Sequence, residues 1–257
     1  MFKRKVLAIC YNLYPDTSAQ AQQISPLLQK LAEYCDVKIV SGDFGDVSFG
    51  EDKRALENVY KLKLKSSFIE NRLPFLNRVL YRFLPFYHKS PDALRGSIKK
   101  VVKDIEKNIL NVFYPDVIIS FGHPMSDHLI GHSLSKDYEI PLITHFSDPW
   151  ADNPYFKHLF PLTDRIYSVR AEKLVTSHAA AVIFTNKFGL EHFLKYREDS
   201  LKEKCFVIPH SIPALTYDIP KSMEVSGKFI IRHVGSLYGL RNPDALLASL
   251  LLLEHLY

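Results

Sequence analysis

Along the first 212 residues, short runs that are apolar, or in which apolar and polar residues alternate, are separated by amphipathic stretches. The runs predict buried or half-buried strands at 5–10, 36–43, 57–66, 115–122, 140–146, 180–185 and 204–212. Between them, apolar residues recur at intervals of three and four, which predicts helices at 20–35, 92–111, 123–138, 163–178 and 186–196. Strands that alternate with helices in this way are typical of the α/β class, with helices on both faces of a doubly wound parallel sheet.

The pattern breaks at residues 213–227, which hold two prolines, show little periodicity and end on glycine. A further strand is predicted at 229–234, and a helix follows it to residue 256. One strand and one helix cannot bury both faces of a sheet. We therefore expect a first domain at 1–212, a linker at 213–227 and the opening strand–helix unit of an incomplete second α/β domain at 228–257.

Composition agrees with a globular protein, because 47% of the 257 residues are hydrophobic and 24% are charged. The net charge of +5 is mild, but residues 60–89 hold seven lysines and arginines against one glutamate. Within this segment, Arg72, Arg78 and Arg82 accompany apolar and aromatic residues at helical spacing. A basic amphipathic helix suits an anionic membrane surface, and an ordinary packed helix with solvated arginines is the alternative. No nucleic-acid recognition motif accompanies the basic residues, so nucleic acid is not an expected partner.

The compartment is predicted from cysteines and hydropathy. Three widely spaced cysteines without a C-x-x-C motif indicate free thiols in a reducing compartment. The apolar run near the N-terminus is too short for a signal peptide, and no stretch reaches the ~20 apolar residues that span a bilayer. The expected location is the cytoplasm, either free or peripheral on the inner face of the membrane.

Unusual chemistry is concentrated where strands are expected to end. Ligands of open parallel sheets bind beyond the carboxyl ends of the strands, which directs attention to loops 11–19, 121–127, 144–155 and 235–242. In the stretch "ITHFSDPWADNPY", His145, Asp148 and the sole tryptophan, Trp150, directly follow a buried strand. Asp148 either accepts a hydrogen bond from a ligand hydroxyl or caps the turn at Pro149. Trp150 either stacks on a sugar or anchors its loop on the core.

The segment "GHPMSDHLIGH" has a second concentration of chemical groups, formed by His123, Asp127, His128 and His132. His128 and His132 are four residues apart and share a helix face, as zinc ligands do. Position 129 is leucine, however, so the glutamate base of an H-E-x-x-H motif is missing. A solvated helix face is the preferred interpretation of these residues.

Four stretches in this order resemble glycosyltransferase family 4. They are "ITHFSDPW" after a buried strand, "AAVIFTNKFGLEHFL", "VIPHSIP" before the linker, and "IIRHVGSLYGLRNPDALLASL". The resemblance implies a GT-B enzyme, a retaining transferase whose two Rossmann-like domains face each other. It would move a sugar from a nucleotide diphosphate sugar to a glycan or lipid-linked acceptor in surface polysaccharide synthesis. No cofactor and no metal are implied.

The resemblance also assigns roles to residues. His145 and Asp148 would serve catalysis, and Trp150 and His123 would contact the acceptor. Ser18, Gly235, Ser236 and Arg241 would contact the donor phosphates.

Several positions depart from the family pattern. Thr17, Ser18 and Ala19 stand where the family has a glycine pair, and Pro209, His210 and Ser211 replace its P-N-G. Ser236 replaces an arginine that binds phosphate, and Arg241 stands near the position of the family's lysine. The glutamate pair of the donor domain has no counterpart, so the 257-residue chain by itself is expected to transfer sugar poorly. A non-catalytic binding module derived from such an enzyme is the main alternative, and a metal-dependent hydrolase is a weaker one.

Overall fold

The structure is a computed structural model that describes residues 3–43, 58–62, 91–92, 94–153, 161–195, 197, 199–210, 230–233, 235, 237 and 242–254. These residues divide into two compact units, Met1–Pro213 and Ala214–Tyr257. The predicted linker bounds stay predictions, because residues 211–229 lie outside the described residues. So do Arg72, Arg78 and Arg82 of the basic segment. No helix in the described part of the chain is long and apolar enough to cross a membrane.

A seven-stranded sheet organises the first unit, and all of its strands are parallel. The strands follow the order β3-β2-β1-β4-β5-β6-β7. Their bounds are Lys5–Ile9 (β1), Asp36–Gly42 (β2), Val59–Leu62 (β3), Val117–Phe121 (β4), Leu142–Phe146 (β5), Ala181–Phe184 (β6) and Cys205–Val207 (β7). The predicted α/β class with a Rossmann-like, doubly wound sheet is confirmed. The strand order reverses between β1 and β4, because β2 and β3 lie on one side of β1 and β4 to β7 lie on the other. Ligands of sheets of this kind bind at this switch point.

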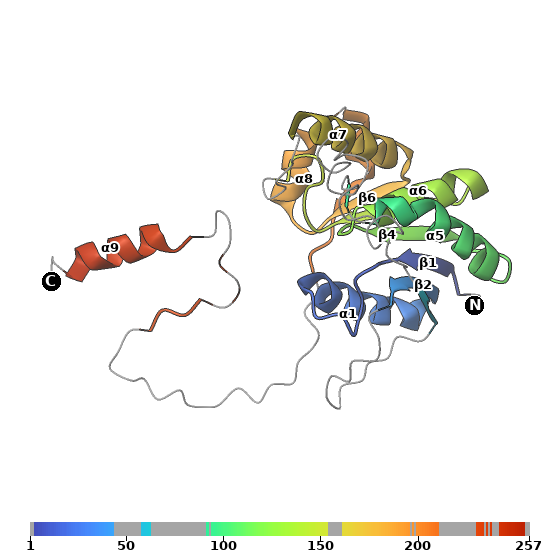
Figure 1. The fold of residues 1–257 in the computed structure, drawn as a ribbon, viewed down its shortest axis with the longest axis horizontal. Coiled ribbons are helices and arrows are strands. Elements are labelled where there is room, and N and C mark those ends of the chain that lie inside the picture. The colour runs from blue at the N-terminus through green and yellow to red at the C-terminus, as the bar shows by residue number, and fades with distance from the viewer. Residues whose placement is uncertain are drawn as a thin grey trace, which may run out of the picture. The chain divides into compact units, whose positions relative to one another are not determined.

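Helices connect the strands, at Ala19–Tyr34 (α1), Ile98–Ile105 (α5), Ser126–Tyr138 (α6), Pro161–His178 (α7) and Lys187–Leu194 (α8). The helix predicted at 92–111 is composite, because α5 is preceded by a 3₁₀ turn at Arg95–Ser97 and continues as a π-helical turn at Glu106–Leu110. A 3₁₀ segment at Asp199–Lys204 leads into β7. Figure 1 shows α1 on one side of the sheet and α5 and α6 on the other.

Each face of the sheet has its own apolar core. Val6 and Ala8 of β1 pack with Ile24 and Leu28 of α1 on one face. Leu7 and Ile9, the alternate residues of β1, belong to the larger cluster on the other face, where α5, α6, α7 and α8 contribute. Strands buried on both faces need apolar side chains at successive positions, which explains why the sequence shows them as short continuous runs.

The second unit differs from the sequence prediction. Its helix α9, Asp244–Glu254, lies within the predicted helix. The predicted strand at 229–234 is wrong for the described residues 230–233, which form no strand. Ile230 and Ile231 are 65% and 52% exposed. A strand is stable only when its backbone pairs with a neighbour, and the described residues of this unit offer none.

Candidate functional site at the carboxyl edge of the sheet

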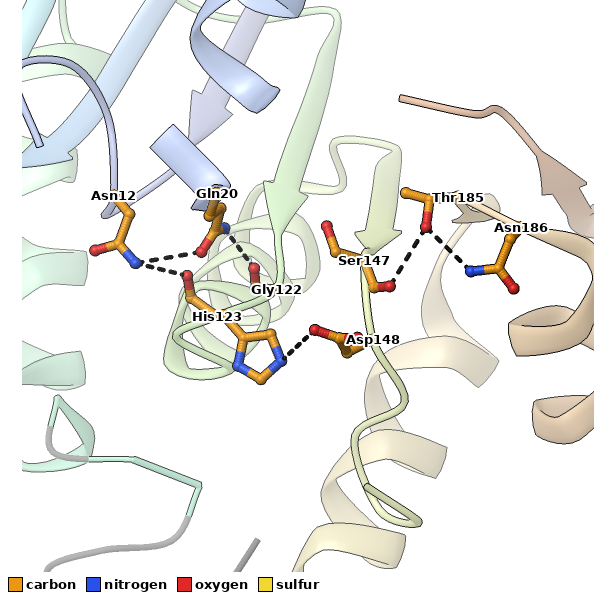
Figure 2. Close-up of polar contacts among 8 residues, drawn as sticks. All are labelled: Asn12, Gln20, Gly122, His123, Ser147, Asp148, Thr185 and Asn186. Atoms are coloured by element: carbon orange, nitrogen blue, oxygen red, sulfur yellow. Dashed lines mark hydrogen bonds and ion pairs between the residues drawn. The ribbon is translucent and has the colours of Figure 1, made fainter. Parts of the chain in front are cut away.

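Polar side chains from four successive loops meet at the carboxyl edge of the sheet (Figure 2). The loops follow β1, β4, β5 and β6. The residues that Figure 2 labels are Asn12, Gln20, Gly122, His123, Ser147, Asp148, Thr185 and Asn186. Because all strands are parallel, groups that are far apart in sequence are delivered to one edge.

Two amide side chains join the β1 and β4 loops at the point where the strand order reverses. The Nδ2 of Asn12 donates to the Oε1 of Gln20 and to the carbonyl of His123, both at 3.2 Å. The Nε2 of Gln20, in the first turn of α1, donates to the carbonyl of Gly122. This bridge fixes the β4 loop beside the start of α1 (Figure 2).

A buried carboxylate, that of Asp127, also connects the β1 and β4 loops. Asp127, in the first turn of α6, is 2% exposed, and its Oδ2 accepts a hydrogen bond from the backbone N–H of Tyr11 at 2.7 Å. Burial raises the pKa of Asp127 well above its usual value, and the neighbouring carboxylate of Asp92 raises it further. Asp92 in turn accepts from the backbone N–H and the hydroxyl of Ser126 at 2.8 and 2.7 Å.

His128 lies fully inside the protein, with an exposed fraction of 0%. Its Nδ1 is 2.8 Å from the hydroxyl of Ser120, and its ring packs 4.3 Å from the ring of Phe146. Burial lowers the pKa of His128 to about 3, so the ring is neutral at pH 7. The predicted solvated helix face is therefore wrong for Asp127 and His128, because this face of α6 packs on the sheet.

His123 has an unusual backbone and faces a carboxylate. Its φ of 61° lies in the left-handed region, which is uncommon for a residue with a side chain. Its Nε2 lies 3.5 Å from the Oδ2 of Asp148, and the two side chains are 32% and 62% exposed. Burial lowers the pKa of His123, while Asp148 and Asp92 oppose that shift. This pair gives the edge a solvent-accessible imidazole and carboxylate side by side.

His145 is the last but one residue of β5 and is 4% exposed. Its Nδ1 has no hydrogen-bond partner among the described residues. The ring lies 5.1 Å from that of Phe121 and 6.1 Å from that of His210. Burial lowers the pKa of His145 to about 4, and His210 lowers it too. His145 is thus a neutral imidazole at physiological pH, with one donor and one acceptor nitrogen.

Trp150 is buried at 1% exposure beside His128, with 6.1 Å between the ring centroids. No ring face is left for stacking on a sugar, so its predicted contact with the acceptor does not fit this structure. The adjacent Ala151 donates its backbone N–H to the Oε2 of Glu172 at 3.0 Å, and Arg197 binds the other carboxylate oxygen. Trp150 and Glu172 together hold the β5 loop on the core.

The predicted phosphate contacts belong to both units of the chain. Ser18 is the N-cap of α1, where its hydroxyl accepts from the N–H of Ala21 at 3.2 Å and donates to the carboxylate of Asp16. Gly235 belongs to the second unit, with a φ of 132° that favours glycine. Ser236 and Arg241 lie outside the described residues.

The loops at the carboxyl edge contain no positively charged side chain in their described parts. Residues 10–18, 122–125, 147–153, 185–186 and 208–210 include no lysine or arginine, whereas Asp16, Asp148 and Asp152 belong to them. Within the described residues there is also no group of three or more histidine, cysteine, aspartate or glutamate side chains that could hold a metal ion.

Sequence reasoning missed Asn12, Gln20, Thr185 and Asn186. The hydroxyl of Thr185 donates to the carbonyl of Ser147 at 3.3 Å, and Asn186 caps α8 by accepting from the N–H of Gly189 at 2.7 Å. Their position directly after a buried strand, or in the first turn of the next helix, was the signal available. Ordinary polar residue types gave no reason to single them out.

No protein-family description matches this sequence, and no curated protein matches it. Among solved structures, the chain is similar to a UDP-N-acetylglucosamine 2-epimerase, with 13% identity and a TM-score of 0.42 over 80% of this chain and 46% of that one. It is also similar to a spinosyn rhamnosyltransferase complexed with thymidine diphosphate, with 14% identity and a TM-score of 0.36 over 71% and 45%. The chain spans less than half the length of either protein, and likenesses at this level decide no function.

Proposed function

We propose that this chain supplies the acceptor-side domain of a retaining, hexosyltransferase-type glycosyltransferase that uses a nucleotide diphosphate sugar. The proposed acceptor is a glycan or lipid-linked glycan of surface polysaccharide synthesis, as the resemblance to family 4 implies. The observation that carries the proposal is the carboxyl edge itself. Neutral imidazole, amide, hydroxyl and carboxylate groups converge there without a cation in the described loops.

This set of groups matches the hydrogen-bonding needs of a sugar. Each sugar hydroxyl both donates and accepts, and a neutral histidine or a carboxamide does the same. In this proposal the side chain of Asp148 accepts from the acceptor hydroxyl, and His123 lies beside it at 3.5 Å. His145 donates to the sugar or to the leaving diphosphate as its charge develops. The diphosphate is assigned mainly to Gly235, Ser236 and Arg241 of the second unit, as predicted from the sequence.

The experiment that tests the proposal measures release of nucleoside diphosphate from UDP-, GDP- and dTDP-sugars by the natural full-length protein, with and without lipid-linked glycan. We expect release that requires the acceptor and falls at least about tenfold in His145→Gln, since one lost charge-stabilising hydrogen bond is worth about 1.5–3 kcal/mol. The matched control is His192→Gln, because His192 is an exposed residue in the last turn of α8, at the opposite end of that helix from the edge.

Two results would count against this proposal. Glycan binding without any release of nucleoside diphosphate would favour the non-catalytic binding module. Absence of both glycan binding and donor turnover would refute the proposal as a whole.

We further propose, from sequence alone, that the basic segment binds anionic membrane. Replacing Arg78 and Arg82 by glutamate should then reduce sedimentation of the protein with phosphatidylserine vesicles, with the far-UV circular dichroism unchanged. Equal sedimentation of the variant and the parent protein would refute membrane contact and leave the transferase proposal untouched.

A further inference from the structure

His210 lies next to His145 although the two come from strands that are not neighbours. β5 and β7 are separated by β6, and strands two places apart are roughly 10 Å from each other. The ring centroids of His145 and His210 are nevertheless only 6.1 Å apart, with the planes inclined by 53°. The two side chains therefore lean toward each other across the carboxyl end of β6.

The backbone pairing between β7 and β6 ends directly before His210. The backbone N–H of Ile208 donates to the carbonyl of Phe184 at 2.9 Å, which extends the pairing with β6 one residue beyond β7. Pro209 follows and cannot donate a further backbone hydrogen bond, so the ladder stops there. His210 is thus the first residue after the ladder that can present a polar side chain at the edge.

His210 has no hydrogen bond to any other described residue, and its side chain is half-buried. Its surroundings at this edge are His145 from β5 and Asp148 from the β5 loop, whose negative charge opposes the lowering of its pKa by burial. A half-buried imidazole without a hydrogen-bond partner among the described residues has ring nitrogens that a ligand can bond. The 6.1 Å separates the ring centroids, so ring nitrogens that face each other are closer than that. A hydroxyl group to one side of the line between two such nitrogens can lie within about 2.7–3.0 Å of both.

We infer that His210 is a sugar-contacting residue of the site and acts as a pair with His145, the two rings holding a hydroxyl of the sugar acceptor between them. This inference rests on the proposed function and adds a residue to it. The inference also explains why His210 stands where family 4 has the asparagine of its P-N-G stretch. An imidazole side chain is longer than a carboxamide and can approach His145 across the end of β6.

The test has one arm that needs no ligand. The titration of the His145 ring is followed by NMR in the parent protein and in His210→Gln. If the rings are neighbours, the pH at the midpoint of the His145 titration rises in the variant, because the variant lacks the neighbouring ring that can take up positive charge. An unchanged midpoint in His210→Gln would overturn the pairing. His192→Gln is the control and should leave the midpoint of His145 where it is.

The second arm measures binding of methyl glycosides of glucose, galactose and mannose to the natural full-length protein. We expect His210→Gln and His145→Gln each to weaken the binding about fivefold to tenfold, as the loss of one hydrogen bond predicts, and His192→Gln to leave it unchanged. Binding by His210→Gln that equals the parent's would overturn the role of His210 while the proposed function stands. No glycoside binding together with no donor turnover by the parent would overturn both.

Discussion

His128, on the face of α6 that packs on the sheet, has a hydrogen bond at one ring nitrogen, and the other ring nitrogen has no partner among the described residues. The hydroxyl of Ser120 meets Nδ1 at 2.8 Å, and Nε2 is buried. Charging such a ring would place a cation among Phe146, Trp150 and the neutral ring of His145, which is why its pKa is lowered to about 3. The residue is neutral in the folded protein and titrates normally only when the chain unfolds.

The stability contributed by His128 should therefore depend on pH. The unfolded chain takes up this proton near pH 6.5 and the folded protein near 3, so stability is fully present above about 6.5 and is lost as pH falls from 6.5 toward 3. The measurement is urea unfolding of the parent and His128→Gln at pH 7 and pH 5. The free-energy difference between them should shrink by up to about 1.4 kcal/mol per pH unit. The raised pKa values of Asp127 and Glu172 have the opposite effect, because they make the protein more stable as the pH falls. Both proteins contain these two residues, so this effect cancels in the difference. A difference that does not change with pH would contradict the neutral buried ring.

Among the elements, α7 and the β5 loop depend on one buried ion pair. Glu172 is 3% exposed and bonds the N–H of Ala151 and the guanidinium of Arg197, which also lies 5.2 Å from the ring of Phe193. The pair joins α7, the β5 loop and the segment after α8. Because Ala151, which Glu172 binds, directly follows Trp150, this ion pair also positions the loop that carries Asp148.

Breaking this ion pair should destabilise the protein strongly. Glu172→Ala leaves Arg197 and the Ala151 N–H buried without partners, which should lower the free energy of unfolding by about 3–5 kcal/mol. The exposed pair Lys187–Glu191 on α8, at 3.5 Å, is the control, and Glu191→Ala should change stability by less than about 0.5 kcal/mol. Equal losses in thermal denaturation of the two variants would show that Glu172 does not have this role.

Helix α6 approaches the sheet closely at a glycine. A methyl group on Gly131 would lie 3.1 Å from the Cβ of Ser120 and from a methyl carbon of Leu142. Alanine is favoured over glycine inside helices by about 0.5–1 kcal/mol, but here the strand backbone under Ser120 must move to admit the methyl.

Gly131→Ala should therefore be less stable than the parent by about 1–3 kcal/mol in urea unfolding. Gly96→Ala is the control, because a methyl there meets nothing within 4 Å and should be neutral or stabilising. A stabilised Gly131→Ala would mean that α6 can lift from the sheet at no cost.

At the scale of the whole molecule, the apolar cores belong to the first unit. All residues of the two core clusters lie between Val6 and Cys205. In the second unit, α9 carries leucines that are exposed by 37–66%, namely Leu246, Leu247, Leu250, Leu251, Leu252 and Leu253. A single helix of this length is marginal in water without a surface to pack on.

A fragment of residues 1–213 should therefore unfold cooperatively with the same midpoint as the parent, within about 3 °C, when followed by circular dichroism. The fragment 214–257 should show little helix as a monomer. A first fragment without a cooperative transition would mean that the sheet needs the second unit for its stability.

The sequence by itself located all seven strands of the sheet and most helices, although the last strand, Cys205–Val207, is shorter than predicted. Each central strand is buried on two faces and is therefore largely apolar, and each helix must turn one apolar stripe to the sheet, so both leave a local pattern. The crowded loop around His145 and Asp148 was found for a similar reason, because a strand end in a parallel sheet is a known place for ligands. The strand at 57–66 was found too, although the structure describes only its part at Val59–Leu62.

Only the tertiary structure decided what depends on which elements meet. Helix α6 packs on the sheet with the face that includes Asp127 and His128, and local spacing could not distinguish this from a solvated face. Trp150 is buried because α7 and Arg197 hold its loop inward, and residues 230–233 form no strand because none of the described residues pairs with them. His145 and His210 are neighbours because of the strand order and because their side chains lean toward each other across the end of β6. The two histidines are 65 positions apart in the sequence, and a local pattern cannot show that two such distant residues are in contact.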